Sequence, residues 1–261
     1  MAGTHGSARA AGPHAQRRSA VRTAVVWEAL QSVLEAMPDA ARSESGPARV
    51  IDIGGGTGGF AVRAAGLGHR VTVIDPSPDA LAALARRADE QGVAHLVTGQ
   101  QGDLGNLLDL VPESSADVVL CHGVLEVVED PADALDTIAR VLRPGGTLSL
   151  LVNQRHAAVV ARAMSGHFGQ ARDLLEGRGV PEGGTATARR FTAPEATELL
   201  EHAGFRPRAV HGVRVFADLV PSSLVDLEPG AAEALAELER AASTRPEYLS
   251  LAAQLHVIAE R

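Results

Sequence analysis

A glycine-rich stretch that follows an acidic residue is the part of the sequence with the clearest chemical purpose. The apolar run 49–53 contains Asp52 and leads directly into Gly54, Gly55 and Gly56. A buried strand that feeds a glycine turn presents backbone N–H groups and bare backbone to a nucleotide-like ligand. Asp75 ends the apolar run 70–75, about twenty residues further on, where a carboxylate can bind two ribose hydroxyl groups. These residues therefore predict a cofactor site.

The glycine pattern alone does not decide which cofactor binds, because G-x-G-x-x-G at Gly54, Gly56 and Gly59 is equally typical of dinucleotide-binding folds. The absence of lysine excludes several classes of enzyme chemistry, since all 24 basic residues are arginines. It excludes a Schiff-base lysine and the lysine of a P-loop. It also excludes the Tyr-x-x-x-Lys pair of the short-chain dehydrogenases. An oxidoreductase that binds NAD remains a distant alternative, as does a module that senses the cofactor without turnover.

Alternating strands and helices must position these residues. Strands are expected at 49–53, 70–75, near 93–99, at 116–121 and at 147–152, with helices at 58–66, 77–91 and 131–142. This alternation predicts a parallel sheet with right-handed crossovers. After Asn153 the pattern predicts a helical stretch at 157–175, a helix at 194–203, a strand pair at about 206–219, a helix at 230–242 and a last strand at 250–259.

Composition indicates one α/β domain in the 261 residues, of which 45% are hydrophobic. Residues 1–19 lack periodicity and are predicted to be a disordered tail, and 20–261 to form the domain, with an amphipathic helix at 21–37. The sequence has no run of about 18 apolar residues, so we expect no membrane span. It also has no apolar leader, so we expect no secretion signal. The single Cys121 is consistent with a reducing compartment, so we expect a cytoplasmic protein.

Four segments in order resemble the motifs of the class I S-adenosylmethionine-dependent methyltransferases. They are 50–59, Asp75, 101–104 and 142–148. The resemblance implies a Rossmann-like sheet of seven strands with an antiparallel last strand, and S-adenosylmethionine as cofactor. It also implies that Gln101, Gly102 and Asp103 lie near the adenine. The expected closing strands favour this cofactor over NAD.

The flanking segments 22–27, 121–126, 212–216 and 255–257 resemble the bacterial methyltransferases that esterify the carboxyl group of carboxymethoxyuridine at the tRNA wobble position. In that group the residues that match Arg22 and His122 belong to the cofactor site. The chain departs from the group where its relatives carry lysines, an aromatic residue, an arginine and a tyrosine. Here these positions hold Glu-Gly-Arg-Gly-Val-Pro-Glu at 176–182, Val152, Ala253 and Gln254. Each departure weakens contacts to phosphates or bases.

Charge is distributed unevenly along the chain. Residues 153–192 hold six arginines and three acids, a net charge of +3, whereas the whole chain carries −8 and the remainder therefore −11. We expect the inserted segment 154–192 to cover an anionic acceptor, either a tRNA anticodon or a small carboxylate or hydroxyl compound. The expected acceptor-binding residues are Asn153, His156, Arg190 and Arg214.

The chemistry of the acceptor decides whether a base is needed. A carboxylate is ionised at neutral pH and needs none, whereas a phenol or hydroxyl would need His122 or His156 to remove its proton. No residue is singled out as catalytic in the sequence. The pair His156 and His167 lacks further ligands, so a metal site is not expected.

Overall fold

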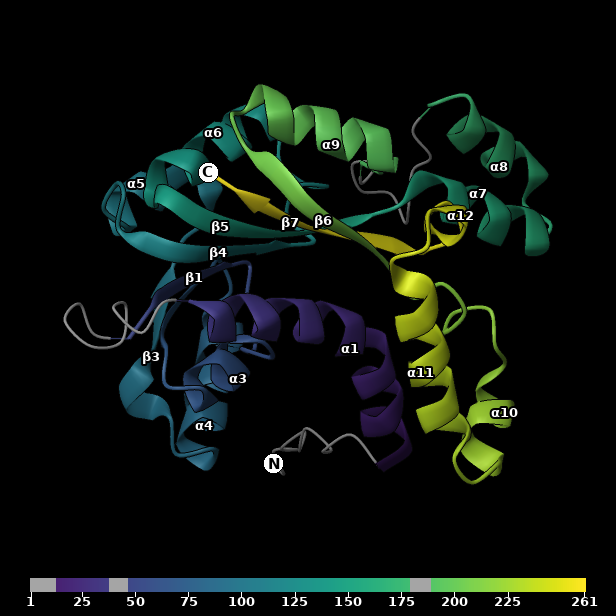
Figure 1. The fold of residues 1–261 in the computed structure, drawn as a ribbon, viewed down its shortest axis with the longest axis horizontal. Coiled ribbons are helices and arrows are strands. Elements are labelled where there is room, and N and C mark those ends of the chain that lie inside the picture. The colour runs from purple at the N-terminus through teal and green to yellow at the C-terminus, as the bar shows by residue number, and fades with distance from the viewer. Residues whose placement is uncertain (1–12, 38–46, 179–188) are drawn as a thin grey trace, which may run out of the picture.

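The computed structural model describes residues 13–37, 47–178 and 189–261 and contains a seven-stranded sheet (Figure 1). The strand order is β3-β2-β1-β4-β5-β7-β6, and β7 runs antiparallel to both of its neighbours. The predicted seven-stranded sheet with an antiparallel last strand is therefore confirmed. The strands are β1 (Arg49–Ile53), β2 (Arg70–Asp75), β3 (Val97–Gln101), β4 (Ala116–His122), β5 (Leu142–Asn153), β6 (Arg206–Val213) and β7 (Gln254–Glu260).

Helices cover both faces of the sheet because successive strand residues point to opposite sides. On β4, Val118 and Leu120 pack toward one face, whereas Val119 and Cys121 pack toward the other. In Figure 1 the helices α1 (Pro13–Ala36), α3 (Ala61–Gly66) and α4 (Pro78–Glu90) lie below the sheet. The helices α5 (Leu107–Leu110), α6 (Pro131–Val141) and α9 (Ala193–His202) lie above it.

The remaining helices gather beyond the carboxyl end of β5. They are α7 (Arg155–Met164), α8 (Phe168–Leu175), α10 (Ser222–Leu227), α11 (Ala231–Ser243) and α12 (Pro246–Leu249), and Figure 1 shows them on the right. The ion pair between Arg240 and Glu28, 2.7 Å long, joins α11 to α1. The 3₁₀ turns Ala94–Leu96 and Leu104–Asn106 flank β3.

Local sequence signals fix most of the boundaries. Ser77 and Asp130 accept hydrogen bonds from the first turns of α4 and α6, each of which begins with proline. No helix in the described ranges is long and apolar enough to cross a membrane.

Several expectations differ from the structure. The helical stretch predicted at 157–175 is two helices, α7 and α8. The predicted strand pair at 206–219 is the single strand β6, because Arg214 adopts a positive φ of 59° that ends the extended conformation. The third strand begins at Val97 rather than near residue 93, since a 3₁₀ turn precedes it. The last strand begins at Gln254, after α12. Helix α1 begins at Pro13, inside the predicted tail 1–19, and residues 1–12 lie outside the described residues.

Candidate active site

A cavity of about 1060 Å³ lies at the carboxyl ends of β1, β2 and β4, which is where open α/β sheets bind ligands. We call it the cofactor cavity. It brings together five of the residues expected to bind a cofactor: Gly54, Asp75, Gly102, Asp103 and His122. Its far wall comes from the segment after β4 and the start of α6, with Val124, Val127, Val128, Glu129, Asp130 and Asp133 among the lining residues.

The glycines of the first loop are required by close contacts. A Cβ atom on Gly54 would lie 2.6 Å from Val124 Cγ2, and Gly54 has a φ of 67°. A Cβ atom on Gly55 would lie 2.4 Å from Asp52 Oδ2 and 2.9 Å from Val73 Cγ1. Side chains at these positions would displace the loop, so its backbone keeps the close approach that a bound nucleoside needs.

Asp75 is held by the same loop. Its Oδ2 accepts a hydrogen bond from Gly56 N–H at 2.8 Å, and its Oδ1 accepts one from Ser77 N–H at 2.9 Å. Each carboxylate oxygen keeps a second lone pair, and the side chain lines the cofactor cavity. This geometry suits a carboxylate that binds a pair of vicinal hydroxyl groups.

Asp52 lies directly beneath the loop and is almost fully buried, with 3% exposure. Burial, together with the nearby charge of Asp75, raises the pKa of Asp52 from 3.8 to about 7. The negative charges of ionised Asp52 and Asp75 therefore repel each other.

His122 is the end of a buried polar row that crosses three strands. Its Nε2 lies 2.9 Å from Ser149 Oγ, and the same hydroxyl lies 2.8 Å from His256 Nε2. Phe60 packs edge-on against the His122 ring. Burial lowers the pKa of His122 to about 4, so the imidazole is neutral at physiological pH.

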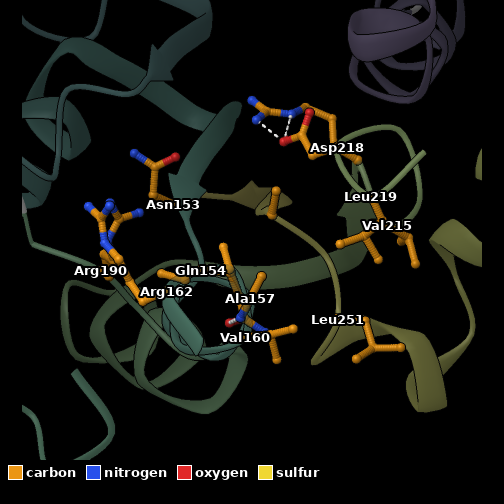
Figure 2. A pocket seen from close by; sticks show the side chains of 14 residues that line it. Asn153, Gln154, Ala157, Val160, Arg162, Arg190, Val215, Asp218, Leu219 and Leu251 are labelled. Atoms are coloured by element: carbon orange, nitrogen blue, oxygen red, sulfur yellow. Dashed lines mark hydrogen bonds and ion pairs between the residues drawn. The ribbon is translucent and has the colours of Figure 1, made fainter. Parts of the chain in front are cut away.

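A second cavity, of about 280 Å³, lies between α7, the turn after β6 and the end of β5. We call it the acceptor cavity. Figure 2 shows Asn153 and Arg190 on one side of it and Asp218 at the top, and Arg214, which bonds to Asp218, also lines the cavity. Gln154 and Arg162 also line it, and the rest of the wall is apolar and includes Ala157, Val160, Val215, Leu219 and Leu251.

The register of β7 connects the polar residues of this cavity. Gln254 pairs with Asn153 on β5 and with Val213 on β6. Its Nε2 donates to Asn153 Oδ1 at 3.3 Å, and its Oε1 accepts from Arg214 Nη1 at 3.3 Å. The antiparallel last strand thus brings two expected acceptor residues into one hydrogen-bonded chain.

The comparisons with known proteins agree with this geometry. Residues 51–150 match the family model described as "Methyltransferase domain". The chain is 31% identical over 249 residues to the tRNA 5-carboxymethoxyuridine methyltransferase of Escherichia coli O157:H7, covering 92% of this chain and 88% of the relative. The chain belongs to the class I S-adenosylmethionine-dependent methyltransferases.

Two further likenesses show the breadth of the family around this methyltransferase. The Ubiquinone biosynthesis O-methyltransferase of Xanthomonas axonopodis pv. citri is 35% identical over 178 residues, covering 66% of this chain and 69% of the relative. The crystal structure of an S-adenosylmethionine-dependent methyltransferase from Mesorhizobium loti superposes with a TM-score of 0.58 at 23% identity, covering 92% of this chain and all of that one. The latter shows the fold.

S-adenosylmethionine is the cofactor of the methyltransferase, and the residues of the cofactor cavity fit it. Gly123 lines the cavity with a φ of 72°, and a Cβ atom there would meet only open space, so backbone can contact a ligand directly. Asp75, the loop Gly54–Gly56 and Gly102–Asp103 would hold the nucleoside, as the family resemblance implies.

Besides Gly55 and Gly56 of the glycine loop, three expected residues line neither cavity. Arg22 is 53% exposed and pairs with Asp218 at 3.2 Å, so it contacts the acceptor side of the site rather than the wall of the cofactor cavity. Gln101 donates from Nε2 to the carbonyl oxygen of Pro76. His156 is exposed in the first turn of α7, outside the acceptor cavity. The roles of these three residues stay predictions.

Glu126 is a residue of the site that the sequence reasoning did not assign. It is buried, and its Oε1 accepts a hydrogen bond from Asn153 N–H at 2.7 Å. Burial raises the pKa of Glu126, although the hydrogen bond from Asn153 and the charge of Arg190 lower it in part. Glu126 therefore ties the segment after β4 to the end of β5. The signal for Glu126 in the sequence was its position four residues after His122, the last residue of β4.

Cys121 is buried on β4, and two arginines of the inserted segment form ion pairs with acids. Burial raises the pKa of Cys121 to about 12, which suits a buried structural residue rather than a nucleophile. Arg155 pairs with Glu195, and Arg178 pairs with Asp173 and Glu176. The positive charge of the segment is thus partly neutralised by local acids.

Proposed function

We propose that this methyltransferase transfers the methyl group of S-adenosylmethionine to a carboxylate oxygen of an anionic acceptor. The cofactor supplies a methyl group on a sulfonium, so the carbon–sulfur bond breaks as the acceptor oxygen bonds to carbon, and no proton has to move. The protein then mainly has to align the two reactants. Asn153, Arg190 and Arg214 supply hydrogen-bond donors for the carboxylate in the acceptor cavity.

The observation that carries this proposal is the weakness of the available base. With a pKa of about 4, His122 is too weak to remove a proton from a hydroxyl group at neutral pH. His156 lies outside the acceptor cavity, and Asp218 in that cavity is paired with Arg22 and Arg214. A carboxylate acceptor, which arrives ionised, fits such a site better than a phenol or alcohol does.

The acceptor is either the carboxymethoxy group of a tRNA wobble uridine or a small carboxylate. The relative from E. coli supports the first by its name and its coverage of this chain. A small-molecule O-methyltransferase is the second candidate, favoured by the apolar wall of the acceptor cavity.

Two measurements test the proposal. Calorimetric titration with S-adenosylhomocysteine should show binding that Asp75→Ala abolishes, and NAD should not bind. Transfer of a radiolabelled methyl group should then be measured to carboxylates and to alcohols of matched size, from pH 6 to 9. Methyl esters formed at a rate independent of pH support the carboxylate proposal. Methyl ethers formed at a rate that rises with pH would instead identify a hydroxyl acceptor and a general base.

A further inference from the structure

The acceptor cavity has two chemically different halves (Figure 2). One half carries the polar side chains of Asn153, Arg162 and Arg190. The other half consists mostly of aliphatic side chains from α7, the turn after β6 and the residues that follow α12, including Val160, Leu219 and Leu251, beside the ion pair of Arg214 and Asp218. Such a division matches a ligand that is charged at one end and apolar at the other.

Resting on the function proposed above, we propose that the acceptor is a small amphipathic carboxylic acid rather than an RNA. Its carboxylate lies at Asn153 and Arg190, and its hydrocarbon part lies against Val160, Leu219 and Leu251.

The polar half is linked to the wall of the cofactor cavity through Glu126. Asn153 N–H bonds to Glu126, and the neighbours of Glu126 in sequence, Val124, Val127 and Val128, line the cofactor cavity. A carboxylate bound at Asn153 would therefore lie on the residue that this hydrogen bond ties to the cofactor side of the site.

The apolar half is open to solvent. Val160, Leu219 and Leu251, which all line the cavity, are 39%, 47% and 43% exposed. Exposed apolar side chains gathered around a cavity indicate a binding surface, whereas single ones do not. A hydrocarbon chain can therefore lie against these three residues.

The same surface is poorly suited to RNA. Proteins bind single-stranded RNA by stacking bases on aromatic rings and by pairing arginines with phosphates. No aromatic residue lines the acceptor cavity in the described part of the chain. Arg155 and Arg178 are paired with local acids, and Arg189 donates to the carbonyl oxygens of Val128 and Glu129. These arginines are therefore engaged within the protein.

A chain-length series tests the inference. With the full chain and radiolabelled S-adenosylmethionine, kcat/KM should be measured for acetate, hexanoate and octanoate, with octan-1-ol as the uncharged control. Each methylene group buried in the cavity should raise kcat/KM about fourfold. Octanoate should also bind to the protein loaded with S-adenosylhomocysteine, and octan-1-ol should not be methylated.

Matched variants test which residues bind the hydrocarbon part and the carboxylate of the acceptor. Leu251→Ser should lower kcat/KM for octanoate about tenfold relative to kcat/KM for acetate, because only the longer acid reaches Leu251. Leu238→Ser, at an equally exposed leucine on α11 outside the cavity, should change neither. Arg190→Gln should weaken binding of both acids, and binding of S-adenosylhomocysteine should be retained in all three variants.

The outcomes separate this inference from the proposed function. Equal rates for acetate and octanoate, no binding of any acid, or methylation of only a tRNA that carries carboxymethoxyuridine would overturn the amphipathic acceptor. In the first and last of these cases, transfer to a carboxylate would still stand. Methylation of octan-1-ol but not octanoate would contradict the proposed function itself.

Discussion

His122 Nε2 lies 2.9 Å from the hydroxyl oxygen of Ser149, which is fully buried, whereas His122 is half-buried. The same hydroxyl also lies 2.8 Å from His256 Nε2, so Ser149 can donate to one imidazole and accept from the other. Ser149 thereby couples the orientation and tautomer of His122, at the cofactor cavity, to a histidine on the last strand.

Ser149→Ala should destabilise the protein by about 2 kcal/mol, because two buried imidazole nitrogens lose their partner. It should also weaken binding of S-adenosylhomocysteine severalfold, since His122 is no longer held. Urea denaturation and calorimetry measure the two effects. Ser165→Ala is the control, because that exposed serine bonds only to a carbonyl within its own helix. Equal stabilities for the two variants would show that the hydrogen bonds of Ser149 to His122 and His256 do not hold His122 in place.

Asp52→Asn should stabilise the protein without ligand at alkaline pH. The pKa of Asp52 is about 7 in the folded state and 3.8 otherwise, so the folded protein binds the proton more tightly and loses stability as pH rises from about 4 to 7. Asparagine removes this loss. The difference in unfolding free energy between variant and wild type should grow from near zero at pH 4 to as much as about 4 kcal/mol at pH 8. A difference that does not depend on pH would mean that Asp52 has an ordinary pKa.

Gly55→Ala should lower affinity for S-adenosylhomocysteine more than tenfold and cost about 1–3 kcal/mol of stability, because its Cβ atom would overlap Asp52 and Val73. Gly169→Ala provides the matched control. That exposed glycine lies in α8 with nothing within 4 Å of an added Cβ, so alanine there should stabilise the helix by up to about 1 kcal/mol. If Gly55→Ala binds S-adenosylhomocysteine as tightly as the wild type does, the loop does not contribute to cofactor binding.

Asp218→Asn tests the role of Arg22. In the structure Arg22 pairs with Asp218, whereas the family resemblance implies that it binds the cofactor. Exposed ion pairs are weak, so releasing Arg22 should tighten S-adenosylhomocysteine binding by about two- to fivefold, and Arg22→Gln should weaken it. The double variant should bind as Arg22→Gln does, because the two effects share one guanidinium. If Arg22→Gln leaves the affinity unchanged, the ion pair is structural only.

Much of the fold could be predicted from local patterns. The strands β1 and β2, the helices α4 and α6, and the glycine loop all lie where apolar periodicity, capping residues and prolines indicate. The errors fall where local signals were absent or misleading. Arg214 interrupts an apolar stretch with a positive φ that favours glycine, and Gln154 starts α7 two residues before the apolar pattern does. That earlier start leaves His156 in an exposed first turn.

The sequence by itself determined the α/β class and the membership of a methyltransferase family, and it predicted the glycine loop with Asp75, because each depends on the order and chemistry of short segments rather than on contacts between distant side chains. Only the tertiary structure decided which distant side chains meet. The antiparallel register of β7 places Gln254 between Asn153 and Arg214, and His256 beside Ser149. Strand register and helix docking are set by packing across the whole sheet, and no local pattern encodes them.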